Sequence, residues 1–342
     1  MGFVPAFRAE ATSGAARGRG SHGIASRAGP RQSALTRGSA RERVVELRAG
    51  EAVATIAPSE GGRIVSLVIA GAERILPKTS ARPAAPPIYW GCYPMVPWAG
   101  RLGDGRIPTD EGEVRIEPNL SPSAIHGLGF ERPWTALEQS ATTVTMECEL
   151  RGRGWPFGGS ARQTLRLSGD ALDLELAVGG YTRPGPAGLG WHPWFTRPPG
   201  GDLALTLDAH EVLVLDRDLV PTGEVRAVSS REDLRAGPLL GDRRLDHVYV
   251  RAKGPAVLMW PDLELRLEFG GDLDTVVVHT PPEGVCVEPQ TMWPNAPLLA
   301  ARGVSDTGLR ILQPGDHLSA TERWSWGEPK TTIRREVRDA RG

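Results

Sequence analysis

The chain has 342 residues, of which 40% are hydrophobic and 24% are charged, and its formal net charge is −1. This composition is typical of a globular protein with a sizeable core, either one large β domain or two smaller domains. A net charge near zero gives no electrostatic reason to expect a nucleic-acid or membrane partner, and no apolar run reaches the ~20 residues that span a bilayer. The three cysteines, Cys92, Cys148 and Cys286, are widely spaced, which favours a reducing compartment such as the cytoplasm over a disulfide framework.

The N-terminal segment differs in composition from the rest of the chain. It is rich in Arg, Ala, Gly and Ser, and Glu10 is the one acidic residue among the first forty. Such a segment cannot bury enough apolar surface to offset its ordering entropy, so we expect residues 1–43 to be a disordered extension. The alternative is an organellar transit peptide, because these peptides are also rich in Arg and Ser and poor in acidic residues.

From about Val44 onward, short runs of alternating apolar residues are separated by Gly, Pro, Asp and Asn. The clearest runs are 142–150, 171–178 and 262–269. Period-two alternation predicts strands with one buried and one solvated face. Many such strands, with 42 glycines and 30 prolines to turn the chain, predict an all-β fold, an antiparallel sandwich or barrel.

Helical patterns are nearly absent from the sequence. Short helical turns are expected around residues 231–240 and 295–303. No linker interrupts residues 44–326, so we expect one large β domain there, followed by a polar tail over residues 327–342.

The first candidate for chemistry is His192, in the stretch GLGWHPWF (188–195). Pro193 restricts His192 to an extended backbone, which fixes the direction of its ring. A histidine can donate or accept a proton near neutral pH, as acid–base catalysis requires. The alternative is a structural histidine buried among core tryptophans.

The second candidate is Glu288, in the stretch GVCVEPQTMWPNA. Cys286 and Glu288 share one face of a predicted strand, and Pro289 ends the strand because it cannot donate a hydrogen bond. A carboxylate at a strand end, before an aromatic and proline-rich loop, is well placed to enter a cleft. The alternative is a surface glutamate at a turn.

Three further stretches, 89–107, 123–134 and 243–250, combine aromatic residues with polar groups in predicted loops. Their polar members include Arg101, Arg106, His126, Arg132, Asp246 and His247. Aromatic rings against the apolar face of a ligand, with charged groups on its hydroxyls, are typical of a sugar site. The alternative is that the tryptophans belong to the core and the charges are solvated.

The sequence has no P-loop, no dinucleotide-binding fingerprint and no GxSxG elbow. Its seven histidines do not pair at a metal-ligand spacing such as HxH or HExxH. We therefore expect no cofactor and no metal.

Together, five stretches in order resemble the aldose 1-epimerase (mutarotase) family of the galactose-mutarotase-like fold. They are PMVPWAGRLGDGRI, IHGLGFERPW, GLGWHPWF, LVPTGEVR followed by LDHVYV, and VCVEPQTMWPNA. The pattern is similar to the bacterial branch with PxxPxxxR and HGxGxxxPW motifs. The resemblance implies a large antiparallel β-sandwich with a sugar cleft across one sheet.

The resemblance also implies roles for individual residues. His192 would be the general acid that protonates the ring oxygen, and Glu288 the base that removes the anomeric hydroxyl proton. The implied substrate-binding residues are Arg101, His126, Asp246 and Trp194, the last one stacking on or walling the sugar ring. The chain reads AGRLGDGRI where the family's common motif is NRI, so Arg106 is an alternative to Arg101.

The predicted activity is a cofactor-independent interconversion of the α and β anomers of a hexose such as glucose or galactose. It needs a protonated histidine beside an ionised glutamate, and the proximity of opposite charges favours that pairing. One alternative is an epimerase for a phosphorylated or modified sugar, which would need extra cations such as Arg132 or Arg183 at the cleft. Others are a non-catalytic sugar-binding module and a glycosidase with Asp246 as the second carboxylate. The expected partner is a small-molecule sugar.

Overall fold

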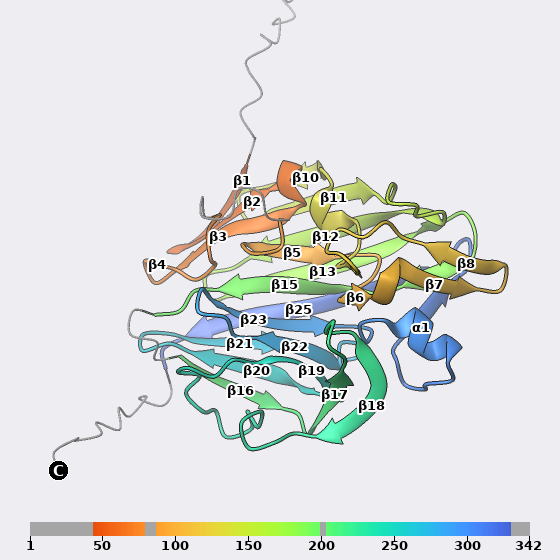
Figure 1. The fold of residues 1–342 in the computed structure, drawn as a ribbon. Helices are drawn as coiled ribbons and strands as arrows, with labels where there is room; N and C mark the ends of the chain where they lie inside the picture. The colour runs from red at the N-terminus through yellow and green to blue at the C-terminus, as the bar shows by residue number, and fades with distance from the viewer. Residues whose placement is uncertain (1–43, 79–86, 199–202, 330–342) are drawn as a thin grey trace, which may run out of the picture. The chain divides into compact units, whose positions relative to one another are not determined.

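The computed structural model describes residues 44–78, 87–198 and 203–329. The predicted extension over residues 1–43 and the predicted tail from residue 330 onward lie outside the described residues. Most described strands belong to two large antiparallel sheets, so the predicted antiparallel β-sandwich is confirmed (Figure 1).

The first sheet has eleven strands, and the second has eight. In spatial order the first sheet consists of β1 (Val45–Ala49), β2 (Ala52–Ala57), β3 (Arg63–Ile69), β5 (Cys92–Met95), β15 (Gly190–Phe195), β23 (Val285–Gln290), β22 (Thr275–His279), β19 (Asp246–Val250), β17 (Glu211–Leu215) and β18 (Pro221–Ala227), with β4 (Ala72–Glu73) paired to β3. The second consists of β10 (Thr135–Gln139), β11 (Thr143–Glu149), β12 (Gly158–Leu167), β13 (Ala171–Tyr181), β25 (His317–Gly327), β21 (Glu264–Glu268), β20 (Lys253–Met259) and β16 (Ala204–Asp208).

Smaller elements connect these strands. Three two-stranded sheets are formed by β6 (Arg101–Leu102) with β9 (Ala124–Ile125), β7 (Arg106–Thr109) with β8 (Gly112–Arg115), and β14 (Gly185–Ala187) with β24 (Arg310–Leu312). The described part also contains α1 (Ala296–Ala301) and three 3-10 turns, Pro58–Glu60, Gly103–Gly105 and Gly129–Glu131. No helix within the described ranges has the length and apolar character to span a bilayer.

Of the two predicted helical turns, only the second forms a helix. Residues 295–303 contain α1, whereas residues 231–240 form turns without a helix. Gly237 takes a left-handed φ of 65°, and Pro238 lacks the N–H that a continuing helix would need. The prediction of a helical turn at 231–240 is therefore wrong.

The alternating apolar residues of the sequence form the core between the two sheets. On β13 the side chains of Leu172, Leu174 and Leu176 are buried, as period-two alternation predicts. Contacts also cross from one sheet to the other: the Phe195 and Trp324 rings lie 5.3 Å apart between centroids. The core thus fixes one face of β15, and the opposite face of that strand is left for other contacts.

One carboxyl group lies inside this core. Glu322 on β25 is 2% exposed, and its Oε2 accepts a 2.8 Å hydrogen bond from the indole N–H of Trp324. Its Oε1 has no hydrogen-bond partner among the described residues. Burial raises the pKa of Glu322 to about 8, so its carboxyl is largely protonated at neutral pH.

We expect the Glu322→Gln variant to be more stable than the wild type at pH 8 and about equally stable near pH 4.5. The unfolded chain loses this proton near the ordinary glutamate pKa of about 4.3, whereas the folded chain keeps it up to about pH 8. The free energy of unfolding of the wild type therefore falls as pH rises through this window, by about 3 kcal/mol between pH 5 and pH 8. Denaturant unfolding across this range measures the effect. Glu224→Gln, at an exposed glutamate, is the control, and parallel curves for Glu322→Gln and the wild type would contradict the prediction.

Candidate functional site

The six site residues predicted from the sequence line one cavity of about 220 Å³. They are Arg101, His126, His192, Trp194, Asp246 and Glu288. A cavity of this size is below the ~300–1,000 Å³ of sites for drug-sized ligands, so it suits a smaller molecule.

The central strands of the eleven-stranded sheet form one wall of this cavity. β15 pairs with β23, β23 with β22, and β22 with β19, so these four strands lie side by side (Figure 1). Trp191 and Phe195 on β15 contact the second sheet, at Gln163 and Trp324, whereas His192 and Trp194, which is also buried, line the cavity. Strand alternation therefore explains why one tryptophan of WHPW is structural and the other borders the site.

His192 and Glu288 are in direct contact, with 3.2 Å between His192 Nε2 and Glu288 Oε1. Their side chains are only 8% and 2% exposed. The Tyr93 ring stacks on the imidazole at 4.8 Å between centroids and 28°, and the Trp194 ring does so at 5.7 Å and 12°. The carbonyl of Ile88 accepts hydrogen bonds from both the Tyr93 hydroxyl (3.1 Å) and the Trp194 indole (2.7 Å). One backbone oxygen thus orients both rings that hold the histidine.

Burial shifts this pair toward its neutral form. It lowers the pKa of His192 well below its ordinary value, with His126 and His279 adding to the effect. It raises the pKa of Glu288 well above its ordinary value; the nearby Asp246 adds to this rise, and Arg101 opposes it. The neutral pair and the ion pair contain the same number of protons, and moving one proton across the 3.2 Å contact interconverts them.

Arg101 reaches the cavity from β6, and His126 reaches it from the position directly after β9, the strand that pairs with β6. Arg101 pairs with Ile125 in this ladder, and the backbone N–H of His126 donates to the carbonyl of Gly100 at 2.9 Å. His126 has a φ of 61°, an uncommon left-handed conformation for a residue other than glycine. Its ring lies edge-on to His192 at 4.9 Å between centroids. Burial, together with Arg101, lowers the pKa of His126 to about 3, so this imidazole is neutral.

The other arginines that the sequence analysis considered as site residues lie outside the cavity. Arg106 makes a 2.6 Å ion pair with Glu113 in the β7–β8 hairpin. Arg132 donates to the carbonyl of Arg151, and Arg183 pairs with Glu111 at 3.3 Å. Among the described residues that line the cavity, Arg101 is the only arginine or lysine.

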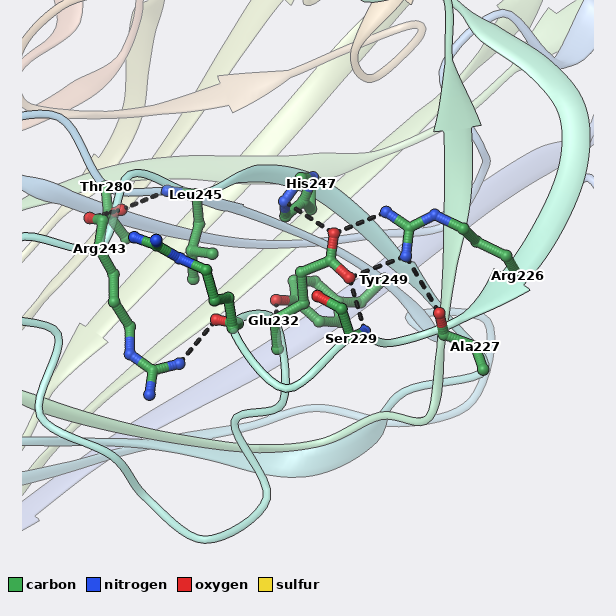
Figure 2. A network of polar contacts seen from close by, with 10 residues as sticks. Arg226, Ala227, Ser229, Glu232, Arg243, Leu245, His247, Tyr249 and Thr280 are labelled. Atoms are coloured by element: carbon green, nitrogen blue, oxygen red, sulfur yellow. Dashed lines mark hydrogen bonds and ion pairs between the residues drawn. The ribbon is translucent and has the colours of Figure 1, made fainter.

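Asp246 and His247 are neighbours on β19, and they point to opposite faces of the sheet. Asp246 lines the cavity, whereas His247 Nε2 lies 3.1 Å from Glu232 Oε1 (Figure 2). Arg226 binds both oxygens of Glu232, at 2.6 and 2.8 Å, and the Tyr249 hydroxyl donates to the Glu232 carbonyl at 2.7 Å. The hydrogen bonds from Arg226 are the main reason that the pKa of Glu232 is lowered to about 2. This charged network anchors the back of β19 and thereby the strand that carries Asp246.

The sequence reasoning missed one polar residue of the cavity, His279, the last residue of β22. Its ring is 31% exposed, and its Nδ1 lies 3.6 Å from Asp246 Oδ1. Val277 and His279 alternate along TVVVH in the way that Cys286 and Glu288 alternate along VCVE. That alternation was the available signal, but it could not tell which face of β22 would meet the cavity.

One group of metal-ligand types also occurs at the site. Three buried residues each place one possible ligand atom within 4.8 Å of the others: His192, Cys286 and Glu288. Burial raises the pKa of the Cys286 thiol well above its ordinary value, whereas a metal would need the thiolate. The set therefore suits a hydrogen-bonding site better than a metal centre.

Comparison with known proteins shows the family to which this chain belongs. The family model described as aldose 1-epimerase matches residues 43–325, which is most of the chain. The chain belongs to the aldose 1-epimerase family. One relative of this epimerase-family chain, the Escherichia coli K12 protein YihR, is 26% identical to it over 265 residues. The match covers 74% of this chain and 85% of YihR.

Solved structures show the same fold. A galactose mutarotase-like protein from Clostridium acetobutylicum superposes with a TM-score of 0.74 at 17% identity, over 83% of this chain and 95% of that protein. A GalM/aldose epimerase homologue from C. elegans gives a TM-score of 0.71 at 18% identity, over 84% and 99% of the two chains. The galactose-mutarotase-like β-sandwich implied by the sequence motifs is thereby confirmed.

Proposed function

We propose that this aldose 1-epimerase family member is a mutarotase that interconverts the α and β anomers of a neutral hexose such as glucose or galactose. The observation that carries the proposal is the buried His192–Glu288 contact of 3.2 Å, which lies in a cavity with Arg101, His126 and Asp246. Anomer interconversion needs one proton removed from O1 and one delivered to the ring oxygen, and a carboxyl–imidazole pair supplies both transfers.

The His192–Glu288 pair accounts for every proton that moves in the proposed reaction. In ring opening, the Glu288 carboxylate takes the proton of the anomeric hydroxyl, the C1–O5 bond breaks, and His192 delivers its proton to O5. The open-chain aldehyde then turns about the C1–C2 bond, and O5 attacks the other face of C1. His192 takes back the O5 proton, and Glu288 returns a proton to O1.

The pair reaches its reactive charge state by proton transfer within the site. Burial favours the neutral carboxyl and neutral imidazole before substrate binds, whereas the reaction begins from the carboxylate and imidazolium. The hydroxyls of a bound sugar replace the water that burial removes from Glu288. Arg101 stabilises the Glu288 carboxylate, and this interaction lowers the pKa of Glu288. Arg101, His126 and Asp246 would hold the sugar hydroxyls, and Trp194 would wall the ring.

The charges of the cavity favour a neutral sugar over a phosphorylated one. Arg101 is the only fixed cation among its described lining residues, and Asp246 is in the same cavity. Arg132 and Arg183, the extra cations considered for a phosphosugar enzyme, do not line the cavity and instead contact the Arg151 carbonyl and Glu111. A phosphate dianion would be expected to require more than one such cation.

Polarimetry of freshly dissolved α-glucose and α-galactose tests the proposal. We expect the protein to accelerate the change in optical rotation of at least one of them, and to act more slowly on glucose 6-phosphate than on glucose. Sugar binding by calorimetry without any acceleration would instead support a non-catalytic binding module. Release of a chromogenic aglycone would support a glycosidase and overturn the proposal.

A further inference from the structure

His279 is a polar cavity residue that the proposed reaction does not use. It pairs directly with Asp246 in the β19–β22 ladder, and its Nδ1 lies 3.6 Å from Asp246 Oδ1. Both side chains line the cavity and are partly exposed, at 31% and 44%. They therefore form a pair that a ligand in the cavity can reach.

The strand order places this pair at one side of the His192–Glu288 pair. β22 is next to β23, which carries Glu288, and β19 is the following strand. Since neighbouring strands lie about 4.8 Å apart, His279 and Asp246 are about 5 and about 10 Å across the sheet from β23. A sugar with its anomeric carbon at Glu288 can extend its far side over β22 and β19.

Trp194 borders both pairs. Its ring stacks on His192 at 5.7 Å and 12°, and it meets His279 edge-on at 5.8 Å and 88°. The same indole thus connects the reacting end of the cavity with the His279–Asp246 end. Next to the latter, Val248 and Val277 form an apolar wall.

The chemistry of the second pair matches a hydroxyl group. Burial lowers the pKa of His279, although Asp246 opposes the shift, so the imidazole is neutral at pH 7 and has one donor and one acceptor nitrogen. The carboxylate oxygens of Asp246 accept hydrogen bonds. A sugar hydroxyl donates one hydrogen bond and accepts others, so it can satisfy both partners at once.

We propose that His279 and Asp246 form a second polar subsite, which binds a hydroxyl of the sugar on the side of the ring away from the anomeric carbon. His279 is then a specificity-determining residue for aldoses that carry this hydroxyl. The assignment rests on the proposed function, because that function places the anomeric carbon at Glu288.

Kinetics of His279→Phe on glucose and on 2-, 3-, 4- and 6-deoxyglucose test this subsite. For glucose we expect KM to rise about threefold to tenfold, the size of one lost hydrogen bond, while kcat stays within about twofold of wild type. One deoxy sugar should show a raised KM with the wild type and no further rise with the variant, and this sugar identifies the hydroxyl. His279→Gln, which restores a donor, should recover part of the affinity. His210→Phe, at a largely exposed histidine that does not line the cavity, is the matched control.

Two results would overturn the subsite. One is a loss of affinity in His279→Phe by the same factor for glucose and for every deoxy sugar; the other is a fall in kcat at unchanged KM. Calorimetry with 1,5-anhydroglucitol, which has no anomeric hydroxyl and cannot react, separates this inference from the proposed function. Weaker binding to His279→Phe than to the wild type supports the subsite even if the wild type shows no mutarotation. Equal binding to both proteins, or no binding to the wild type, would refute it.

Discussion

If the chain is a mutarotase with Glu288 as its base, exchange of Glu288 for Gln should lower kcat by about 10²–10⁴-fold, the usual contribution of a positioned acid–base group. The amide keeps the size of the carboxyl group but cannot take the anomeric proton. His192→Asn should have an effect of the same order, because it removes the group proposed to donate to the ring oxygen. Since the two side chains are in contact at 3.2 Å and act as one unit, the double variant should be little slower than either single variant.

The measurement is the initial rate of optical rotation change, corrected for the spontaneous reaction. Arg106→Ala is the control, because Arg106 pairs with Glu113 and does not line the cavity; its rate should equal that of the wild type. Circular dichroism must show that the Glu288 and His192 variants remain folded. A folded Glu288→Gln variant with wild-type kcat would exclude Glu288 as the base.

The second large effect is on stability: Gly127→Ala should lower the free energy of unfolding by about 4 kcal/mol. Gly127 follows His126 and has a left-handed φ of 77°, which costs an L residue energy. A Cβ at this position would also overlap the carbonyl of Val96. That carbonyl accepts the N–H groups of Leu128 and Gly129 at 2.7 and 3.0 Å, so any displacement weakens both hydrogen bonds.

Chemical denaturation of Gly127→Ala and Gly271→Ala separates the cost of the left-handed backbone conformation from the cost of the overlap with Val96. Gly271 also has a left-handed φ, 62°, but a Cβ there would meet no atom within 4 Å. Gly271→Ala should therefore show only the conformational cost, about 1–2 kcal/mol. Equal losses in the two variants would contradict the predicted overlap with Val96. Any Gly127→Ala protein that folds should also bind sugar less well, because the change displaces His126.

Much of the fold follows from local sequence pattern. The alternation of Val144, Met146 and Cys148, for example, predicts one buried face, and β11 buries these three residues. The helical turn expected at 231–240 does not form: Gly237 takes a left-handed φ of 65°, Pro238 has no N–H to donate, and Leu234 and Leu240 are buried within an irregular loop instead. The local sequence could not show that a loop would bury these leucines.

The sequence by itself determined the fold class and the family motifs, and it predicted which side chains would carry the chemistry, such as His192, Glu288 and Arg101. Only the tertiary structure decided that His192 touches Glu288, that Arg101 rather than Arg106 lines the cavity, and that His279 joins Asp246. The physical reason is that strand alternation depends on neighbours along the chain, whereas contacts between β15, β23, β22 and β19 depend on strand order and register. Those two properties are set by the packing of the whole core, and no single segment contains them.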